Sequence, residues 1–250
     1  MEYVFATGLG RSGTKFLTSL LSTVHNVHSV HEYIGNREFW LLSWYLPGTV
    51  YTLPFLAREK EKIDKIYNTG LFIDINGYLQ NCVPELHATF KPIKIFHFVR
   101  DPKEVVRSLY TRRDDSDIHL IPKNLSEVEQ WLDGDKFTQI CWNWANTTEK
   151  LLSEKTELIH FEKIKSDFDY CNEKIIQPLN LNLSKTVWEK AVLTKVNSTK
   201  PLWYRWIYSN LKKKKLMKDE LPSYPKWTDI QKKQFADICG STMLKCGYEL

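Results

Sequence analysis

The chain has no long hydrophobic run, no regular cysteine spacing and no strong excess of charge. No apolar stretch approaches the ~18 residues that can cross a membrane, and strand-like sequence from residue 3 leaves no room for a signal peptide. Cysteines at positions 82, 141, 171, 239 and 246 are scattered, without the spacing of metal ligands. We therefore expect reduced thiols, a cytoplasmic compartment and no bound metal.

Charge and composition are those of an ordinary folded protein. The net charge of +5 is small and no basic–aromatic stripe accompanies it, so nucleic-acid binding is not indicated. Apolar residues make up 42% of the 250 residues, and no repeat, low-complexity segment or Gly/Ser linker divides them. We therefore predict a single domain over residues 1–250, with one large core and a mild preference for anionic ligands.

Strand and helix signals alternate along the chain. Apolar, β-favouring runs occur at residues 3–7, 27–32, 71–74, 94–99 and 157–161. Helical periodicity or capping signals occur at residues 16–24, 37–46, 55–67, from 102 onward, and at 127–131, 137–154, 168–176, 185–193, 204–215 and 228–246. Strands that alternate with helices predict a three-layer α/β/α fold with a mostly parallel sheet.

A glycine-rich turn joins the first predicted strand to the first predicted helix. It reads GLGRSGTKF from Gly8 to Phe16. Glycines let successive backbone amides point into one concavity, and the following helix adds free amides and a favourable dipole. Arg11, Lys15 and the hydroxyls of Ser12 and Thr14 supply charge and further hydrogen bonds. The segment therefore predicts a cradle for a tetrahedral anion.

The same segment is close to the P-loop of nucleotide-hydrolysing enzymes, Gly-x4-Gly-Lys-Ser/Thr. Gly8 and Gly13 have the required separation, but Thr14 precedes Lys15, so the last two residues are in reverse order. A kinase or NTPase that uses ATP and Mg²⁺ stays open as an alternative. In that alternative Asp74, at the end of a predicted strand, is the acid on the magnesium side.

A second anion site is indicated where the fourth predicted strand ends. Arg100 leaves that strand, and the next helix begins with a cap at Asp101, Pro102 at its first position and Glu104 completing a capping box. Ser108 lies close to two turns beyond Asp101, so its hydroxyl can face Arg100. A guanidinium and a hydroxyl suit a phosphate. Two such sites at strand ends predict a ligand with two phosphate-type groups.

The two motifs resemble those of sulfotransferases that use 3′-phosphoadenosine-5′-phosphosulfate (PAPS). The segment Gly8–Thr14 is similar to their 5′-phosphosulfate loop, and Val99–Pro102 followed by Ser108 is similar to their 3′-phosphate motif. A weaker likeness covers most of the remaining chain. The resemblance implies a sulfotransferase fold related to P-loop kinases, with PAPS as the donor and 3′-phosphoadenosine-5′-phosphate (PAP) as the product.

The resemblance also implies a role for each residue of the two motifs. Loop amides and hydroxyls hold the 5′-phosphosulfate, Arg11 stabilises charge on the sulfuryl group and the bridging oxygen, and Arg100 with Ser108 holds the 3′-phosphate. No bridging metal is needed, because Arg11 and Lys15 already place cations at the leaving group. The residues assigned to PAPS are Gly10, Arg11, Ser12, Gly13, Thr14, Lys15, Phe16, Arg100 and Ser108.

A general base must take the proton of the attacking acceptor hydroxyl. Glu32 follows the second predicted strand, and His31-Glu32 resembles the segment that supplies a catalytic Glu in carbohydrate and tyrosylprotein sulfotransferases. His31 is the rival base, since a His does that work in the cytosolic small-molecule branch. We predict in-line transfer to a hydroxyl of a glycan, a protein tyrosine or a small molecule, with the first two favoured. A non-catalytic module that holds an anionic nucleotide or glycan stays open as a third class.

Overall fold

The computed structural model describes residues 1–48, 50–112, 120–194 and 220–250. A five-stranded sheet lies at its centre, in the order β2-β3-β1-β4-β5, and every pair of neighbouring strands is parallel. The strands are β1 (Glu2–Thr7), β2 (Val27–His31), β3 (Leu71–Ile75), β4 (Lys94–Val99) and β5 (Glu157–His160). All five coincide with the predicted apolar runs, and the predicted α/β fold is confirmed, with a sheet that is parallel throughout.

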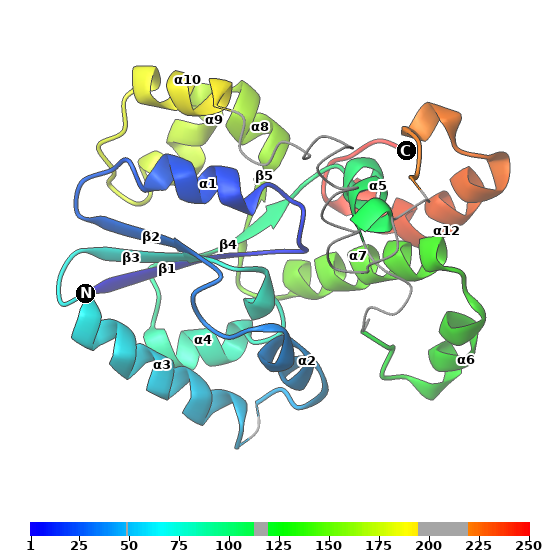
Figure 1. The fold of residues 1–250 in the computed structure, drawn as a ribbon, viewed down its shortest axis with the longest axis horizontal. Coiled ribbons are helices and arrows are strands. Elements are labelled where there is room, and N and C mark those ends of the chain that lie inside the picture. Colours follow the sequence, from blue (N-terminus) through cyan, green and yellow to red (C-terminus); the bar gives the residue numbers. More distant parts are fainter. Residues whose placement is uncertain (49, 113–119, 195–219) are drawn as a thin grey trace, which may run out of the picture.

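Helices cover both faces of the sheet (Figure 1). One face is covered by α1 (Thr14–Leu21), α8 (Phe161–Ser166), α9 (Phe168–Cys171) and α10 (Lys185–Leu193), and the other by α2 (Arg37–Tyr45), α3 (Thr52–Ile66) and α4 (Val83–Phe90). Along β1, Val4 and Ala6 pack on the first face and Tyr3 and Phe5 on the second. Side chains along β1 thus alternate between the two faces and are apolar on both, as expected for a strand buried between two layers of helices.

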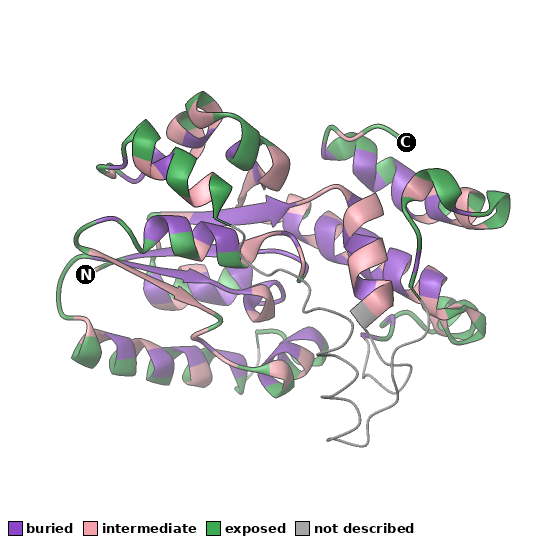
Figure 2. Ribbon diagram, turned by 45° about the horizontal axis from the view of Figure 1, so that its top comes forward, coloured by how far each residue is buried: buried purple, intermediate pink, exposed green. Residues whose placement is uncertain are grey.

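A third group of helices lies beyond the carboxyl ends of β4 and β5. It contains α5 (Pro102–Arg112), α6 (Leu125–Asp133), α7 (Lys136–Ser153) and α12 (Asp229–Lys245), with α12 packed along α7 (Figure 1). The sides of α5, α7 and α12 that face one another are buried and their outer sides are exposed, whereas α6 has no buried residue (Figure 2). No helix among the described residues has the length and apolar composition needed to span a bilayer.

Some helical segments differ from the sequence prediction. The pattern did not indicate the short helices α4 and α8, or the single turns η1 (Gly77–Leu79) and η3 (Tyr224–Lys226). Helix α4 has only eight residues and no side-chain hydrogen bond at its N-cap, although it has a proline and Glu85 in its first turn. The predicted helix 168–176 is α9 followed by a π-helical segment, η2 (Asn172–Ile176). The predicted helix 204–215 lies outside the described residues.

The predicted cap of α5 is only half correct, whereas the capping box of α12 is present. Asp101 Oδ1 accepts the backbone amide of Lys103 at 2.9 Å, as a cap should. The Asp101 amide, which a capping box would join to Glu104, donates to Glu162 Oε1 at 3.0 Å. Glu104 instead pairs with Arg107 at 2.6 Å. A residue of α8 therefore completes this cap, and sequence spacing could not indicate it.

Candidate active site

The glycine-rich segment forms a tight loop between β1 and α1, at the carboxyl edge of the sheet. Gly13 has φ of 91° and Arg11 has φ of 83°, so the chain turns sharply before α1 begins at Thr14. The amides of Phe16 and Leu17 donate to the Gly13 carbonyl. Earlier amides at a helix start have no acceptor within the helix. The loop therefore presents hydrogen-bond donors to an anion.

Two glycines of this loop are required by close neighbours. A Cβ at Gly8 would lie 2.3 Å from the carbonyl oxygen of Phe98, a backbone atom of β4 that cannot rotate away. A Cβ at Gly13 would lie 2.2 Å from the ring of Phe161. A Cβ at Gly10 would meet no atom within 4 Å. The loop thus packs directly against β4 on one side and α8 on the other.

We expect Gly8→Ala to lower the free energy of unfolding by about 1–3 kcal/mol, because the added methyl group displaces the loop from β4. Gly10→Ala is the matched control and should change it by less than about 0.5 kcal/mol. Denaturant unfolding of both variants measures the difference. Equal stability of the two variants would contradict the close approach of the loop to Phe98.

A cavity of about 360 Å³ opens beside this loop. It lies where α/β sheets commonly bind ligands, outside the carboxyl ends of parallel strands. Its lining comes from the loop and the start of α1, from the ends of β2 and β4, from α8 and from the C-cap of α10. It consists of Gly10, Arg11, Gly13, Thr14, Lys15, Phe16, His31, Glu32, Arg100, Phe161, Lys165 and Thr194. The structure therefore brings the predicted anion-binding loop, the predicted base and Arg100 into one cleft.

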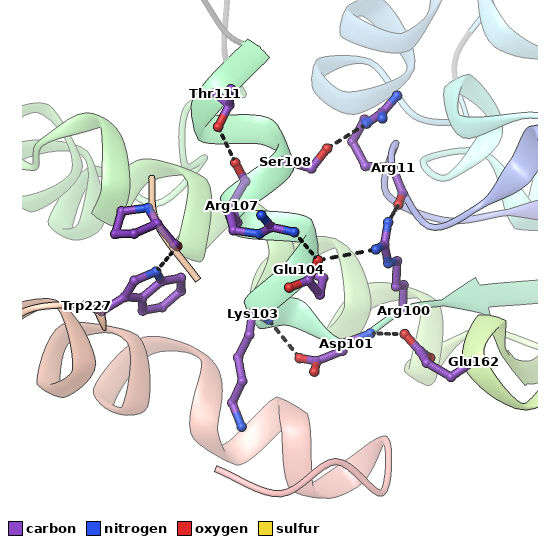
Figure 3. A network of polar contacts seen from close by, with 11 residues as sticks. Arg11, Arg100, Asp101, Lys103, Glu104, Arg107, Ser108, Thr111, Glu162 and Trp227 are labelled. Atoms are coloured by element: carbon purple, nitrogen blue, oxygen red, sulfur yellow. Dashed lines mark hydrogen bonds and ion pairs between the residues drawn. The ribbon is translucent and has the colours of Figure 1, made fainter. Parts of the chain in front are cut away.

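The two predicted anion sites are direct neighbours (Figure 3). Arg11 Nε donates to Ser108 Oγ at 2.9 Å, and Arg100 Nη1 donates to the Arg11 carbonyl at 3.2 Å. The Arg100 guanidinium also lies over the ring of Phe161, 5.3 Å from its centroid. Because α5 carries Ser108 back toward the loop, one ligand can contact both sites.

Two of the residues predicted to bind PAPS have largely buried side chains. Ser12 is 2% exposed and its Oγ donates to the Leu9 carbonyl at 2.8 Å, which stabilises the loop from inside. Phe16 is 5% exposed and packs edge-on against Phe161, with 6.1 Å between ring centroids. Phe16 and the exposed Lys15 both line the cavity. The Ser12 side chain thus stabilises the loop through a hydrogen bond, and Phe16 through packing.

His31 lies between the loop and Glu32. Its Nε2 is 3.0 Å from Thr14 Oγ1, and its Nδ1 is 3.6 Å from Glu32 Oε2. Burial lowers the pKa of His31 and Lys15 adds to the lowering, although the Glu32 carboxylate opposes it. A neutral imidazole can accept a hydrogen bond from the Thr14 hydroxyl. The Glu32 side chain is 36% exposed and reaches the cavity.

Asp74 does not lie where an acid on the magnesium side would be needed. Its side chain is 0% exposed and accepts hydrogen bonds from the backbone amides of Tyr33 and Ile34 and from Asn76. Burial raises the pKa of Asp74 to about 6. No group of three or more His, Cys, Asp or Glu side chains in the described part of the chain could hold a metal ion. Because its oxygens are buried and already bonded to Tyr33, Ile34 and Asn76, Asp74 is not available as the acid of the kinase-type alternative.

Three residues that line the cavity were not assigned from the sequence: Phe161, Lys165 and Thr194. The apolar run 157–161 suggested that Phe161 ends a strand, but the strand ends at His160 and α8 begins at Phe161. Lys165, one helical turn further along α8, is brought to the same cleft. The available signal was that Phe161 ends the apolar run of a predicted strand and Lys165 follows shortly after it, where ligands commonly bind.

A family model described as "Sulfotransferase domain" matches residues 2–245 of the chain. The chain belongs to the sulfotransferase family. The protein is therefore a transferase, and PAPS is the sulfuryl donor that this family uses. This result confirms the fold and the enzyme class that the two motifs predicted.

Solved sulfotransferases share the fold at low sequence identity. The sulfotransferase domain from the curacin biosynthetic pathway matches with a TM-score of 0.53 and 13% identity, covering 100% of this chain and 98% of that one. Mouse sulfotransferase SULT7A1 complexed with PAP matches with a TM-score of 0.52 and 15% identity, covering 97% of this chain and 84% of that one. Sulfotransferase STF1 from Mycobacterium tuberculosis H37Rv matches with a TM-score of 0.54 and 13% identity, covering 94% of this chain and 76% of that one. A comparison with curated protein sequences finds no match.

Proposed function

We propose that this sulfotransferase, acting as a single domain over residues 1–250, transfers the sulfuryl group of PAPS to a hydroxyl of a carbohydrate or a protein tyrosine. The observation that carries the proposal is that the glycine-rich loop, Arg100 and Glu32 all line the same cavity. It combines anion-binding groups with a carboxylate that can accept a proton. An acceptor hydroxyl that enters this cavity therefore meets both the donor and a base.

The donor is held by groups from two segments. Amides of the loop and the Thr14 hydroxyl bind the 5′-phosphosulfate, and Arg11 and Lys15 offset its charge. Arg100 and Ser108 bind the 3′-phosphate; Ser108 is already joined to Arg11 by a hydrogen bond. Like phosphoryl transfer, in-line sulfuryl transfer depends mainly on positioning and on stabilising developing charge. These side chains supply both.

Glu32 is the proposed base, and His31 is the residue that connects Thr14 to Glu32. His31 is engaged with Thr14, while the Glu32 carboxylate is partly exposed at the cavity. Glu32 can therefore take the proton of the acceptor hydroxyl as that oxygen attacks sulfur. A Glu directly after β2 supports the proposal that this chain is closer to the carbohydrate and tyrosylprotein type than to the cytosolic small-molecule type.

Ligand binding tests the donor assignment against the kinase alternative. We expect PAP at 100 times its Kd to stabilise the protein by about 2.7 kcal/mol, and ATP with Mg²⁺ at the same concentration to stabilise it far less. Thermal or denaturant unfolding with each ligand measures this. Preferential stabilisation by ATP–Mg²⁺ would contradict the proposal. Incubation with radiolabelled PAPS and a panel of glycans, tyrosine peptides and phenols then identifies the acceptor class.

Arg100→Gln should weaken PAP binding by roughly 10- to 100-fold, because a charge-assisted hydrogen bond to phosphate contributes about 1.5–3 kcal/mol. Binding of AMP, which has no 3′-phosphate, should change little, so the variant loses its preference for PAP over AMP. Isothermal titration with both nucleotides measures the two affinities. Arg58→Gln, on the exposed side of α3, is the control. An unchanged preference for PAP would remove Arg100 from the 3′-phosphate site.

A further inference from the structure

Asp74 is a fully buried acid that the proposed reaction does not use. It lies near the carboxyl end of β3, opposite Phe5 of β1 and Val30 of β2 in the register of the sheet. Both of these neighbours are apolar. Burying a charge among apolar neighbours is unfavourable unless hydrogen bonds compensate for it. The hydrogen-bond partners of Asp74 should therefore show what its buried carboxylate does.

The partners of Asp74 are concentrated in the turn that follows Glu32. Its Oδ1 accepts the backbone amide of Tyr33 at 3.1 Å, and its Oδ2 accepts that of Ile34 at 3.0 Å. These are the two residues directly after Glu32. Asn76 Nδ2 donates to the same Oδ2 at 2.9 Å. One carboxylate thus holds both amides of the turn, which a neutral side chain with a single acceptor oxygen does less well.

Asn76 anchors this arrangement to the sheet. Its Nδ2 also donates to the Ile34 carbonyl at 2.8 Å, and its Oδ1 accepts the amide of Tyr78 at 2.9 Å. Its own amide donates to the Ala6 carbonyl of β1 at 2.8 Å. We call Asp74 and Asn76 together the turn clasp. Because both side chains are 0% exposed, the clasp has little freedom to move.

Glu32 has a backbone conformation that needs such support. Its φ is 53°, in the left-handed region that residues with a side chain seldom adopt. Such a conformation is unfavourable and persists only where its surroundings enforce it. Here the Glu32 amide donates to the Ile75 carbonyl at 3.2 Å, and the clasp holds the next two residues. The backbone of Glu32 is therefore fixed on both sides by β3 and its end.

The charge of Asp74 favours a functional reason for this arrangement. Burial is the largest influence on this carboxyl and raises its pKa to about 6, and the Glu32 carboxylate acts in the same direction. The ionised form is thus less favourable in the folded protein than in the unfolded chain. A residue chosen for stability alone would avoid this penalty. Unfavourable groups of this kind are concentrated at functional sites.

We propose that Asp74 is a positioning residue for deprotonation of the acceptor: by accepting the amides of Tyr33 and Ile34, it fixes the turn that aims the Glu32 carboxylate into the cavity. This inference rests on the proposed role of Glu32 as the base. It assigns Asp74 no contact with either substrate. Its loss should therefore affect the rate of transfer and leave donor binding unchanged.

A double-mutant cycle tests this role. We expect Asp74→Asn to lower kcat roughly 10- to 100-fold, less than complete loss of a general base, while the Kd for PAP stays within about twofold. In the Glu32→Gln background, adding Asp74→Asn should lower kcat by no more than about twofold, because there is no base left to position. Asp135→Asn, at the exposed N-cap of α7 where Asn caps equally well, is the matched control.

The outcomes separate the two levels of the proposal. Loss of activity in Glu32→Gln with wild-type kcat in Asp74→Asn would overturn the positioning role alone, as would losses that multiply in the double variant. Full activity of Glu32→Gln would overturn the base assignment and the positioning role with it. If Asp74→Asn does not fold, Asn76→Ala removes the other half of the clasp and provides the same cycle. Unfolding curves for each variant confirm a folded state at the assay temperature.

Discussion

Glu32→Gln lowers kcat by about 10²–10⁴ and leaves the Kd for PAP within about twofold; this is the loss expected when a general base is removed. Gln keeps the size and hydrogen-bonding oxygen of Glu but cannot accept the proton of the attacking hydroxyl. Glu32 lines the cavity, and its proposed role is to take the proton of the acceptor and not to hold the donor, so donor binding should persist. Initial rates with radiolabelled PAPS and a fixed acceptor, together with PAP titration, measure the two quantities.

Two comparisons make this result specific. Glu61→Gln, an exposed acid of α3 on the far face of the sheet, should retain the activity of the unmodified protein. His31→Gln should lose less than Glu32→Gln, since His31 is occupied by Thr14. A greater loss in His31→Gln would make His31 the base. Full activity in Glu32→Gln would overturn the assignment of Glu32 as the base.

Arg11→Ala is expected to lower kcat by about 10²–10³, the loss seen when one donor that stabilises transition-state charge is removed. Arg11 is held between the two anion sites: its side chain donates to Ser108 and its carbonyl accepts from Arg100. It can therefore stabilise charge that develops on the bridging oxygen as the bond to sulfur breaks. Single-turnover rates with saturating PAPS isolate this chemical step.

The conservative variant distinguishes charge from geometry at this position. Arg11→Lys keeps the cation but loses the planar fork of donors, so it should recover only part of the activity. Arg58→Ala, which removes an exposed guanidinium on α3, is the control. A loss of PAP affinity with unchanged kcat would show that Arg11 binds the ground state and the transition state equally. That result would contradict a catalytic role.

Local sequence was sufficient to predict the strands and the two anion motifs. Continuous apolar runs identify parallel strands because such strands are buried on both faces. The Gly8–Lys15 loop and the Arg100–Ser108 segment are each contiguous, so their spacing contains most of their geometry. The predicted cap at Asp101 is likewise a contact over two residues. These strands and this cap depend on neighbours in the chain, and for them prediction and structure agree.

Features that depend on distant residues were not predicted correctly. Glu162, rather than Glu104, accepts the Asp101 amide across 61 positions of sequence. Asp74 suggested a metal-side acid because it ends a strand, but its burial and its contacts 40 residues away exclude that role. Phe161 was assigned to a strand, and its contact with Gly13 was not foreseen.

The sequence alone thus predicted a mostly parallel α/β sheet and two contiguous motifs expected to bind anions, and through their resemblance to a known family it predicted the enzyme class. Only the tertiary structure decided that Arg11 reaches Ser108 across 97 positions, that Arg11, Arg100 and Glu32 line one cavity, and that Asp74 holds the turn after Glu32. The physical reason is that local spacing sets backbone conformation, whereas the packing of helices on the sheet sets which distant side chains meet.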